Sequence, residues 1–314
     1  MSKKVLITSR SFGKISNEPL DILTGAGFEV TMKGKDFDQA EFEAMIPDYD
    51  ALIIGAHEFP EAVMERCPKL KIICKHGAGL DNIHLEKAKE LGIAVCNVPG
   101  TNSNAVADLT FGLMLAVARN IVSTNRWAHE GRWQTAIGVD VCGKTLGLMG
   151  FGAIAKNVAR RASGFGMKVL AYDLYPNDSG KAIAEYVDLD TLLAQSDVVF
   201  LHCNLTADNE KMINKASIAK MKDGAILINN SRGQLIDEQD VTDALKAGKL
   251  AAAGLDVVYT EPIRADNPLL TAPNCIITPH MSWGAKEARQ RIMDCTADNI
   301  RAYLDGEPIH VVNP

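Results

Sequence analysis

A glycine-rich turn directly after a short apolar run constrains the fold of this chain more than any other feature. Residues 145–149, Thr-Leu-Gly-Leu-Met, are typical of a buried strand, and residues 150–155, Gly-Phe-Gly-Ala-Ile-Ala, follow at once. The spacing Gly-x-Gly-x-x-Ala is the dinucleotide-binding fingerprint in its alanine form. Gly150 permits a tight turn, and Gly152 lets the backbone approach a pyrophosphate. The motif therefore predicts a strand-turn-helix unit that binds a dinucleotide.

The residues after this turn indicate which dinucleotide. A helix that begins at Ala153 would point its first N–H groups, including that of Ile154, at the phosphates. Asp173 stands 23 residues after Gly150, at the end of the next apolar run, where an acid binds the ribose hydroxyls. The alternative for Asp173 is a solvated carboxylate at a strand end. Because Leu174 offers nothing to a 2′-phosphate, we expect NAD rather than NADP.

Apolar runs alternate with helix-length segments along the chain, and they form two series. The runs lie at 5–8, 29–32, 51–55, 71–75 and 93–97, and then at 145–149, 168–172, 196–202, 225–229, 252–257 and 275–278. Short runs rich in Val and Ile, separated by helical patterns, predict α/β units with parallel sheets. We expect two doubly wound parallel-sheet domains: a Rossmann domain from the second series and a smaller, flavodoxin-like domain from the first.

Three segments outside these runs bear on the domain organisation. Residues 102–120 are apolar on most faces of a helix, which predicts a buried helix between domains or subunits. Residues 121–140 carry two tryptophans without a clear period, so they form either an arm on a partner subunit or a surface loop. Residues 285–305 have near-helical apolar spacing and predict a terminal helix that returns to the first domain. We therefore expect a discontinuous substrate domain and an inserted nucleotide-binding domain, with boundaries at 1–100 plus 285–314, and 101–284.

Charge and cysteine usage exclude several classes of protein. Thirty-three Lys and Arg against 39 Asp and Glu give a net charge of −6 without a basic run, so we expect no nucleic-acid partner. No apolar stretch approaches the roughly 18 residues of a membrane span, and we expect no membrane partner. Seven cysteines without Cys-x-x-Cys spacing are typical of reduced thiols, which predicts a cytoplasmic protein. The histidines show no metal-ligand spacing, so we expect no metal.

Polar residues that fit a redox reaction follow three later strands. Arg232, Glu261 and His280 come after the runs at 225–229, 252–257 and 275–278. Ligands of open α/β sheets bind outside the carboxyl ends of the strands, so these loops should converge. An Arg can hold a carboxylate with two hydrogen bonds, a His can transfer a proton, and a Glu can orient the imidazole. Each residue alone has a structural alternative, as a surface ion pair, a solvated acid or a turn residue.

Other strand ends supply candidate contacts. Cys203 and Asn230 follow two strands of the second series, and we expect both to bind the cofactor. In the first series, residues 77–79 read Gly-Ala-Gly after a strand. Their N–H groups could turn toward one point and form a small nest for a carboxylate. A tight strand-to-helix turn is the alternative.

Taken together, these motifs resemble the D-isomer-specific 2-hydroxyacid dehydrogenase family. The resemblance extends over nearly the whole chain and is carried by residues 77–83, 150–152, 230–233, 254–257, 261–262 and 279–280. It implies that Arg232, Glu261 and His280 are catalytic, with a split catalytic domain and a homodimer built through the nucleotide domain. It also implies that Ala78 and Gly79 bind the substrate carboxylate through their N–H groups, and that Asp256 lies near the nicotinamide carboxamide.

The resemblance to individual members of the family gives conflicting indications of the substrate. Residues 267–291 resemble glycerate dehydrogenases, also called hydroxypyruvate reductases, whereas residues 77–83 are closer to phosphoglycerate dehydrogenases. Many of the latter carry an Arg where this chain reads Gly-Ala-His at 55–57. We therefore expect hydride transfer between NADH and a small unphosphorylated 2-keto acid, such as hydroxypyruvate or glyoxylate, with His280 as proton donor. A D-3-phosphoglycerate dehydrogenase and an NAD-sensing transcriptional corepressor are the alternatives.

Overall fold

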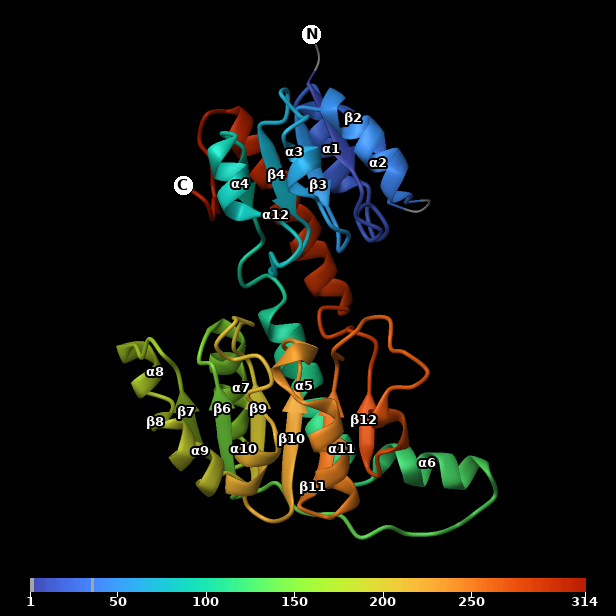
Figure 1. Cartoon of the computed structure of the whole chain (residues 1–314), viewed down its shortest axis with the longest axis vertical. Coiled ribbons are helices and arrows are strands. Elements are labelled where there is room, and N and C mark those ends of the chain that lie inside the picture. The colour runs from blue at the N-terminus through green and yellow to red at the C-terminus, as the bar shows by residue number, and fades with distance from the viewer. Residues whose placement is uncertain (1–2, 35–36) are drawn as a thin grey trace. The chain divides into compact units, whose positions relative to one another are not determined.

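The computed structural model describes residues 3–34 and 37–314, and the chain forms two compact units (Figure 1). Unit 1 comprises Met1–Asn102 and Gly284–Pro314, and unit 2 comprises Ser103–Trp283. The chain thus leaves unit 1 after Asn102 and re-enters it at Gly284.

Unit 1 is a five-stranded parallel sheet with the order β2-β1-β3-β4-β5. Its strands are β1 (Lys4–Ile7), β2 (Glu29–Met32), β3 (Ala51–Ile54), β4 (Ile72–Lys75) and β5 (Ala94–Cys96). Its helices are α1 (Glu18–Gly25), α2 (Gln39–Met45), α3 (Glu61–Met64), α4 (Leu85–Glu90) and α12 (Lys286–Leu304), with a 3₁₀ turn η1 (Ile46–Asp48). Residues of α1 and α12 pack on one face of the sheet, and residues of α2, α3 and α4 pack on the other. This order is that of flavodoxin-like folds, which confirms the predicted fold class.

Unit 2 is a seven-stranded parallel sheet with the order β12-β11-β10-β9-β6-β7-β8. Its strands are β6 (Thr145–Met149), β7 (Lys168–Tyr172), β8 (Glu185–Tyr186), β9 (Val198–Leu201), β10 (Ala225–Asn229), β11 (Leu250–Leu255) and β12 (Cys275–Ile277). Its helices are α5 (Ser103–Ala118), α6 (Ile121–His129), α7 (Ala153–Ser163), α8 (Asp178–Lys181), α9 (Leu189–Gln195), α10 (Lys215–Lys220) and α11 (Glu238–Lys246), with 3₁₀ turns η2 (Gly233–Leu235) and η3 (Pro268–Thr271). The strand order reverses between β6 and β9, as in a Rossmann sheet, and the short edge strand β8 adds a seventh strand to the six predicted.

The helices of unit 2 also cover both faces of their sheet. Apolar residues of α5 and α7 pack on one face, and residues of α9, α10 and α11 pack on the other. Most residues of α5 are buried, as its sequence predicts. The segment after α5 is partly helical, which was not expected: residues 121–129 form helix α6, none of whose residues is buried, and residues 130–140 follow without regular structure.

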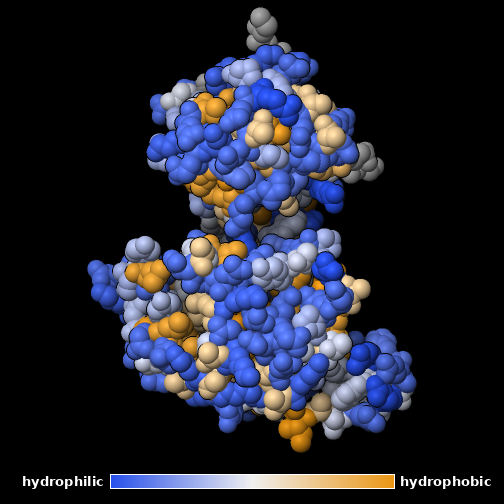
Figure 2. Space-filling view, in the orientation of Figure 1, coloured by the Kyte–Doolittle hydropathy of each residue, from blue (hydrophilic) through white to orange (hydrophobic). Residues whose placement is uncertain are grey.

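The described surface is ordinary for a protein of this composition. The face in Figure 2 is largely hydrophilic, with apolar residues in scattered patches. Within the described residues no single helix combines the length and hydropathy of a membrane span, and only α5 with α6, bent by 64°, reaches them jointly. All seven cysteines are unpaired.

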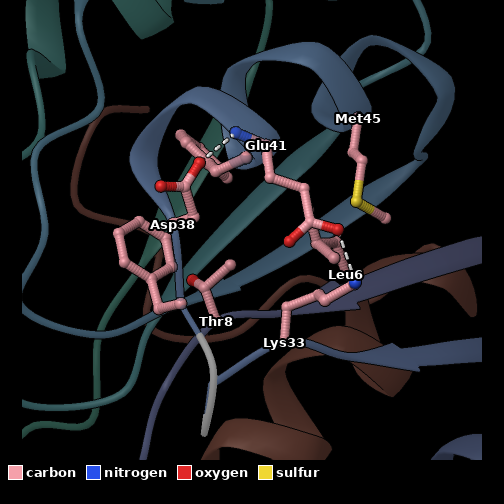
Figure 3. Close-up of a pocket in the computed structure, with 8 residues that line it drawn as sticks. Leu6, Thr8, Lys33, Asp38, Glu41 and Met45 are labelled. Atoms are coloured by element: carbon pink, nitrogen blue, oxygen red, sulfur yellow. Dashed lines mark hydrogen bonds and ion pairs between the residues drawn. The ribbon is translucent and has the colours of Figure 1, made fainter.

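A hollow in unit 1 beside Thr8 and Met45 is bordered by the Lys33–Glu41 ion pair and is too tight for a water molecule (Figure 3).

Candidate active site

The glycine turn after β6 has the geometry that the fingerprint requires. Gly150 has φ +86°, and a Cβ atom there would lie 2.6 Å from the backbone nitrogen of Cys203. Its N–H donates to the carbonyl of Tyr172 at 2.8 Å. Within the described chain, the N–H groups of Gly152, Ala153 and Ile154 donate to no protein acceptor, as is usual at a helix start. Three donors at the N-terminus of α7 are thus available to a pyrophosphate, so the residues fit a dinucleotide.

Asp173 is bound to this turn. Its Oδ2 atom accepts the N–H of Phe151 at 2.6 Å, and its Oδ1 atom accepts the N–H of Tyr175 at 2.8 Å. Each carboxylate oxygen keeps a further lone pair, which a ribose hydroxyl could use. Leu174 beside it is 74% exposed.

A buried asparagine that the sequence interpretation did not single out shapes the loop of Arg232. Asn229 ends β10 with no exposed surface; its Nδ2 donates to the carbonyl of Arg232 at 2.8 Å, and its Oδ1 accepts the N–H of Ser231 at 3.0 Å. Asn at a strand end is a turn signal that could have revealed this role. Gly233 follows, and a Cβ there would lie 2.0 Å from the carbonyl carbon of Val258. The Arg232 loop and the loop after β11 are therefore in direct contact.

Glu261 and His280 form a hydrogen-bonded pair. His280 Nδ1 lies 2.8 Å from Glu261 Oε2, with the histidine backbone at φ +49°. Burial would raise the pKa of Glu261, but the hydrogen bond and charge of His280, the N–H of Val258 and the nearby Arg232 together lower it. An ionised carboxylate only accepts, so Nδ1 carries the proton of this bond and Nε2 remains for exchange with a ligand.

Asp256 organises the segment that carries His280. The side chain is 1% exposed. Oδ1 accepts from Thr278 Oγ1 at 2.5 Å and from the N–H of Met281 at 2.9 Å. Oδ2 accepts from the N–H of Ser282 at 2.8 Å and from its hydroxyl, and the carbonyl of Asp256 accepts the N–H of His280 at 2.8 Å. The four donors to the carboxylate come from residues on both sides of His280, so this buried acid fixes the histidine loop.

Cys203 and Asn230 lie at the ends of the adjacent strands β9 and β10. Burial raises the pKa of the Cys203 thiol to about 11, so its side chain is a neutral group beside the fingerprint turn. Asn230 Nδ2 donates to Ser282 Oγ at 2.9 Å, which joins the Arg232 loop to the His280 loop. Ser282 is thus a second residue that sequence reasoning missed.

In unit 1, Ala78 and Gly79 occupy the turn after β4. Asn97 Nδ2 donates to the carbonyl of Ala78 at 2.9 Å and holds this turn in place. Of the described atoms, none accepts the N–H of Ala78 or Gly79. The cation before them, Lys75, donates to the carbonyl of Gly55 and to Asn82 Oδ1, both at 2.6 Å.

Unit 2 therefore has candidate site residues on both sides of its switch point, the place between β6 and β9 where the strand order reverses. Asp173 follows β7 on one side and suits a ribose. On the other side, three residues follow the neighbouring strands β10, β11 and β12 and supply a cation, an orienting acid and a proton-transfer group: Arg232, Glu261 and His280.

Comparison with known proteins agrees with this geometry. The sequence profile of the D-isomer specific 2-hydroxyacid dehydrogenase NAD binding domain matches residues 111–282. A hydroxypyruvate reductase of Blautia hydrogenotrophica is 44% identical over 285 residues, 88% of either chain. A D-3-phosphoglycerate dehydrogenase of Archaeoglobus fulgidus is 38% identical over 94% of this chain but only 57% of its own length. The crystal structure of a glyoxylate reductase from Paecilomyes thermophila superimposes with a TM-score of 0.90 at 31% identity, covering 99% of this chain and 98% of that one.

The matched NAD-binding domain lies wholly within unit 2, and the relatives of this chain cover most of both units. The chain therefore belongs to the D-isomer-specific 2-hydroxyacid dehydrogenases, a family of NAD-binding oxidoreductases.

Proposed function

We propose that this protein reduces a small, unphosphorylated 2-keto acid of the hydroxypyruvate or glyoxylate type to the corresponding 2-hydroxy acid with NADH. The Glu261–His280 pair carries the proposal, because it supplies an oriented proton donor beyond the ends of β11 and β12, on the other side of the switch point from Asp173. Bound NADH would supply the hydride. His280 Nε2 donates a proton to the substrate oxygen, and Arg232 binds the carboxylate and stabilises the developing negative charge.

The other predicted residues have roles that agree with this assignment. We propose that Gly150, Gly152, Ala153 and Ile154 hold the pyrophosphate and Asp173 the adenosine ribose, with Cys203, Asn230 and Asp256 at the nicotinamide half. Unit 1 would be the substrate domain, whose Ala78 and Gly79 N–H groups bind the substrate carboxylate. No cation at residues 55–57 faces a phosphate, and Lys75 is bound to Gly55 and Asn82, which favours an unphosphorylated substrate.

We further propose a cytoplasmic homodimer that pairs through unit 2. Helix α6 buries none of its residues, and Trp133 and Ile137 beyond it are 96% and 99% exposed. A groove of about 330 Å³ lies between α6 and the β12 edge, and its lining mixes apolar residues such as Val122 and Leu270 with polar ones such as Arg126. A second copy of the chain would cover these apolar side chains, which are costly to leave in water.

The test is NADH oxidation with a panel of 2-keto acids: hydroxypyruvate, glyoxylate, pyruvate and 3-phosphohydroxypyruvate. We expect hydroxypyruvate or glyoxylate to give the highest kcat/KM, and we expect His280→Ala to abolish most of it. A preference for the phosphorylated acid would identify a phosphoglycerate dehydrogenase instead. Turnover of none of the acids, with NADH still bound, would favour a corepressor.

A further inference from the structure

The loop that carries Glu261 is fastened to helix α11 by one carboxylate. Glu238, the first residue of α11, accepts the N–H of Tyr259 at Oε1 (2.7 Å) and Nδ2 of Asn267 at Oε2 (2.8 Å). Tyr259 precedes Glu261 by two residues and Asn267 follows it by six. Glu238 thus holds the loop on both sides of Glu261.

Both partners of Glu238, Tyr259 and Asn267, are held in place by further hydrogen bonds. Asn267 is 9% exposed, and its Oδ1 accepts the N–H of Leu269 at the start of η3. The carbonyl of Tyr259 accepts from Gln234 Nε2 at 2.9 Å, and its hydroxyl donates to Glu210 at 2.7 Å. Glu261, in contrast, has within its own loop only a long contact of 3.4 Å to the N–H of Val258. The position of its carboxylate therefore depends on the course of the loop backbone.

We propose that Glu238 is a positioning residue for proton transfer: by holding Tyr259 and Asn267, it keeps Glu261 Oε2 within hydrogen-bond distance of His280 Nδ1. The inference rests on the proposed role of His280 as proton donor. A purely structural role is the competing explanation, because an acid in the first turn of a helix also stabilises the helix. Such a role would change stability without changing proton transfer.

Several charged groups surround these residues. Arg232 and the buried Asp256 lie by the Glu261–His280 pair. The Glu261 loop itself carries the Arg264–Asp266 ion pair, with a nitrogen–oxygen distance of 3.0 Å. The start of α11 carries Asp240 and its N-cap Asp237, which pairs with Lys211 at 3.1 Å, and Glu210 accepts the Tyr259 hydroxyl. The Glu238 variants leave all of these residues in the sequence.

Three variants separate the explanations. Glu238→Gln turns an amide NH₂ group toward one of the two donors, and Glu238→Asp keeps the charge at the helix start but is too short to reach both. Asp240→Asn is the control, because Asp240 lies in the same helical turn and its side chain accepts the N–H of Lys215 instead. We expect the Glu238 variants to lower kcat for reduction about 10-fold, since small displacements of catalytic groups are costly, with little change in KM for NADH. The alkaline limb of the pH profile should move to lower pH in the Glu238 variants, and Asp240→Asn should leave it in place.

A double-mutant cycle with Glu261→Gln tests whether Glu238 acts through Glu261. Glu238→Gln should not move the limb further when Glu261 is already Gln. NMR of the His280 Nδ1–H proton in the NADH-free protein supplies a readout without turnover. This proton is held between Nδ1 and Glu261 Oε2, so its resonance should move or broaden in Glu238→Gln as in Glu261→Gln. An unchanged resonance and pH profile with only a lower Tm, or equal shifts of the pH profile with and without Glu261, would overturn the proposal. If the proposed function itself is wrong, the parent protein will not reduce the 2-keto acids, or His280→Ala will keep the activity of the parent protein.

Discussion

The Oδ2 atom of Asp173 accepts the N–H of Phe151 at 2.6 Å, so the acid at the end of β7 is tied to the glycine turn at the end of β6. We expect NADH to be preferred over NADPH by about 100-fold in kcat/KM, since a 2′-phosphate would meet this like charge. Asp173→Ala should lower the ratio of kcat/KM with NADH to kcat/KM with NADPH. It should also weaken NADH binding, because the N–H of Phe151 in the glycine turn loses its acceptor. Steady-state kinetics with both cofactors measures the effect, and equal efficiency in the parent protein would contradict the assignment.

Arg232→Lys is expected to lower kcat/KM for reduction by about 100-fold or more. A lysine ammonium is a point charge and cannot replace the planar fork that binds a carboxylate through two hydrogen bonds. NADH binding, followed by fluorescence titration, should change little. Near-normal kcat/KM would show that Arg232 only supports the loop around Asn229.

Replacement of Glu261 with Gln should move the alkaline limb of reduction to lower pH. The carboxylate charge favours the protonated imidazole, and the amide retains a hydrogen-bond acceptor without that charge. We would measure kcat/KM against pH in both directions for the parent protein and the variant. A limb that stays in place would disprove the proposed relay.

The Glu261–His280 pair also predicts how the stability of the protein depends on pH. The pKa of Glu261 lies below its ordinary value of 4.5, through the partners that outweigh its burial. A depressed pKa contributes stability above the unfolded value, and that stability is lost as the pH falls through the folded value. The difference in Tm between the parent protein and Glu261→Gln should therefore shrink below about pH 4.5. A constant difference from pH 7 to pH 3 would contradict this linkage.

Gly233→Ala should be strongly destabilising, by about 1–3 kcal/mol or more, because its Cβ would lie 2.0 Å from Val258 backbone. Gly112→Ala is the matched control: apart from the backbone of its own helix, no atom lies within 4 Å of where its Cβ would be, and alanine in a helix should stabilise by roughly 0.5–1 kcal/mol. Urea unfolding measures both. If the two variants are equally stable, the two loops do not touch as closely as described.

Trp133→Ser combined with Ile137→Ser should shift the protein from dimer to monomer. The exposed segment after α6 would lose the apolar surface that a second copy of the chain would cover. Leu91→Ser, a change at a partly exposed position in unit 1, is the control. Light scattering after gel filtration gives the mass. A monomeric parent protein, or a dimeric double variant, would contradict the proposed interface.

The sequence predicted strands better than it predicted the connections between them. Most of the longer strands, such as β3 and β9, are runs of buried apolar residues, whereas β8 has only two residues and leaves no pattern. Helix α6 was missed because residues 121–140 were interpreted as one segment, and the irregular residues 130–140 conceal the helical pattern of residues 121–129. For the site, Arg232, Glu261 and His280 were visible as strand-end residues. The support from Gly233 and Glu238 was not, because it arises from contacts between loops more than 20 residues apart in sequence. The role of Asn229 is local and could have been found from its position at a strand end.

Because unit 1 is built from both ends of the chain, synthesis and folding follow different orders. Helix α12 contributes Met293, Ala297 and Ile300 to the core face formed by β1, β3 and β4. Helix α1 covers part of this face early, but the part that α12 covers stays exposed until residues 286–304 have been made, and by then every residue of unit 2 has been made. A nascent chain with unit 2 complete and α12 still absent thus exposes apolar strand surface of unit 1, which chaperones can shield.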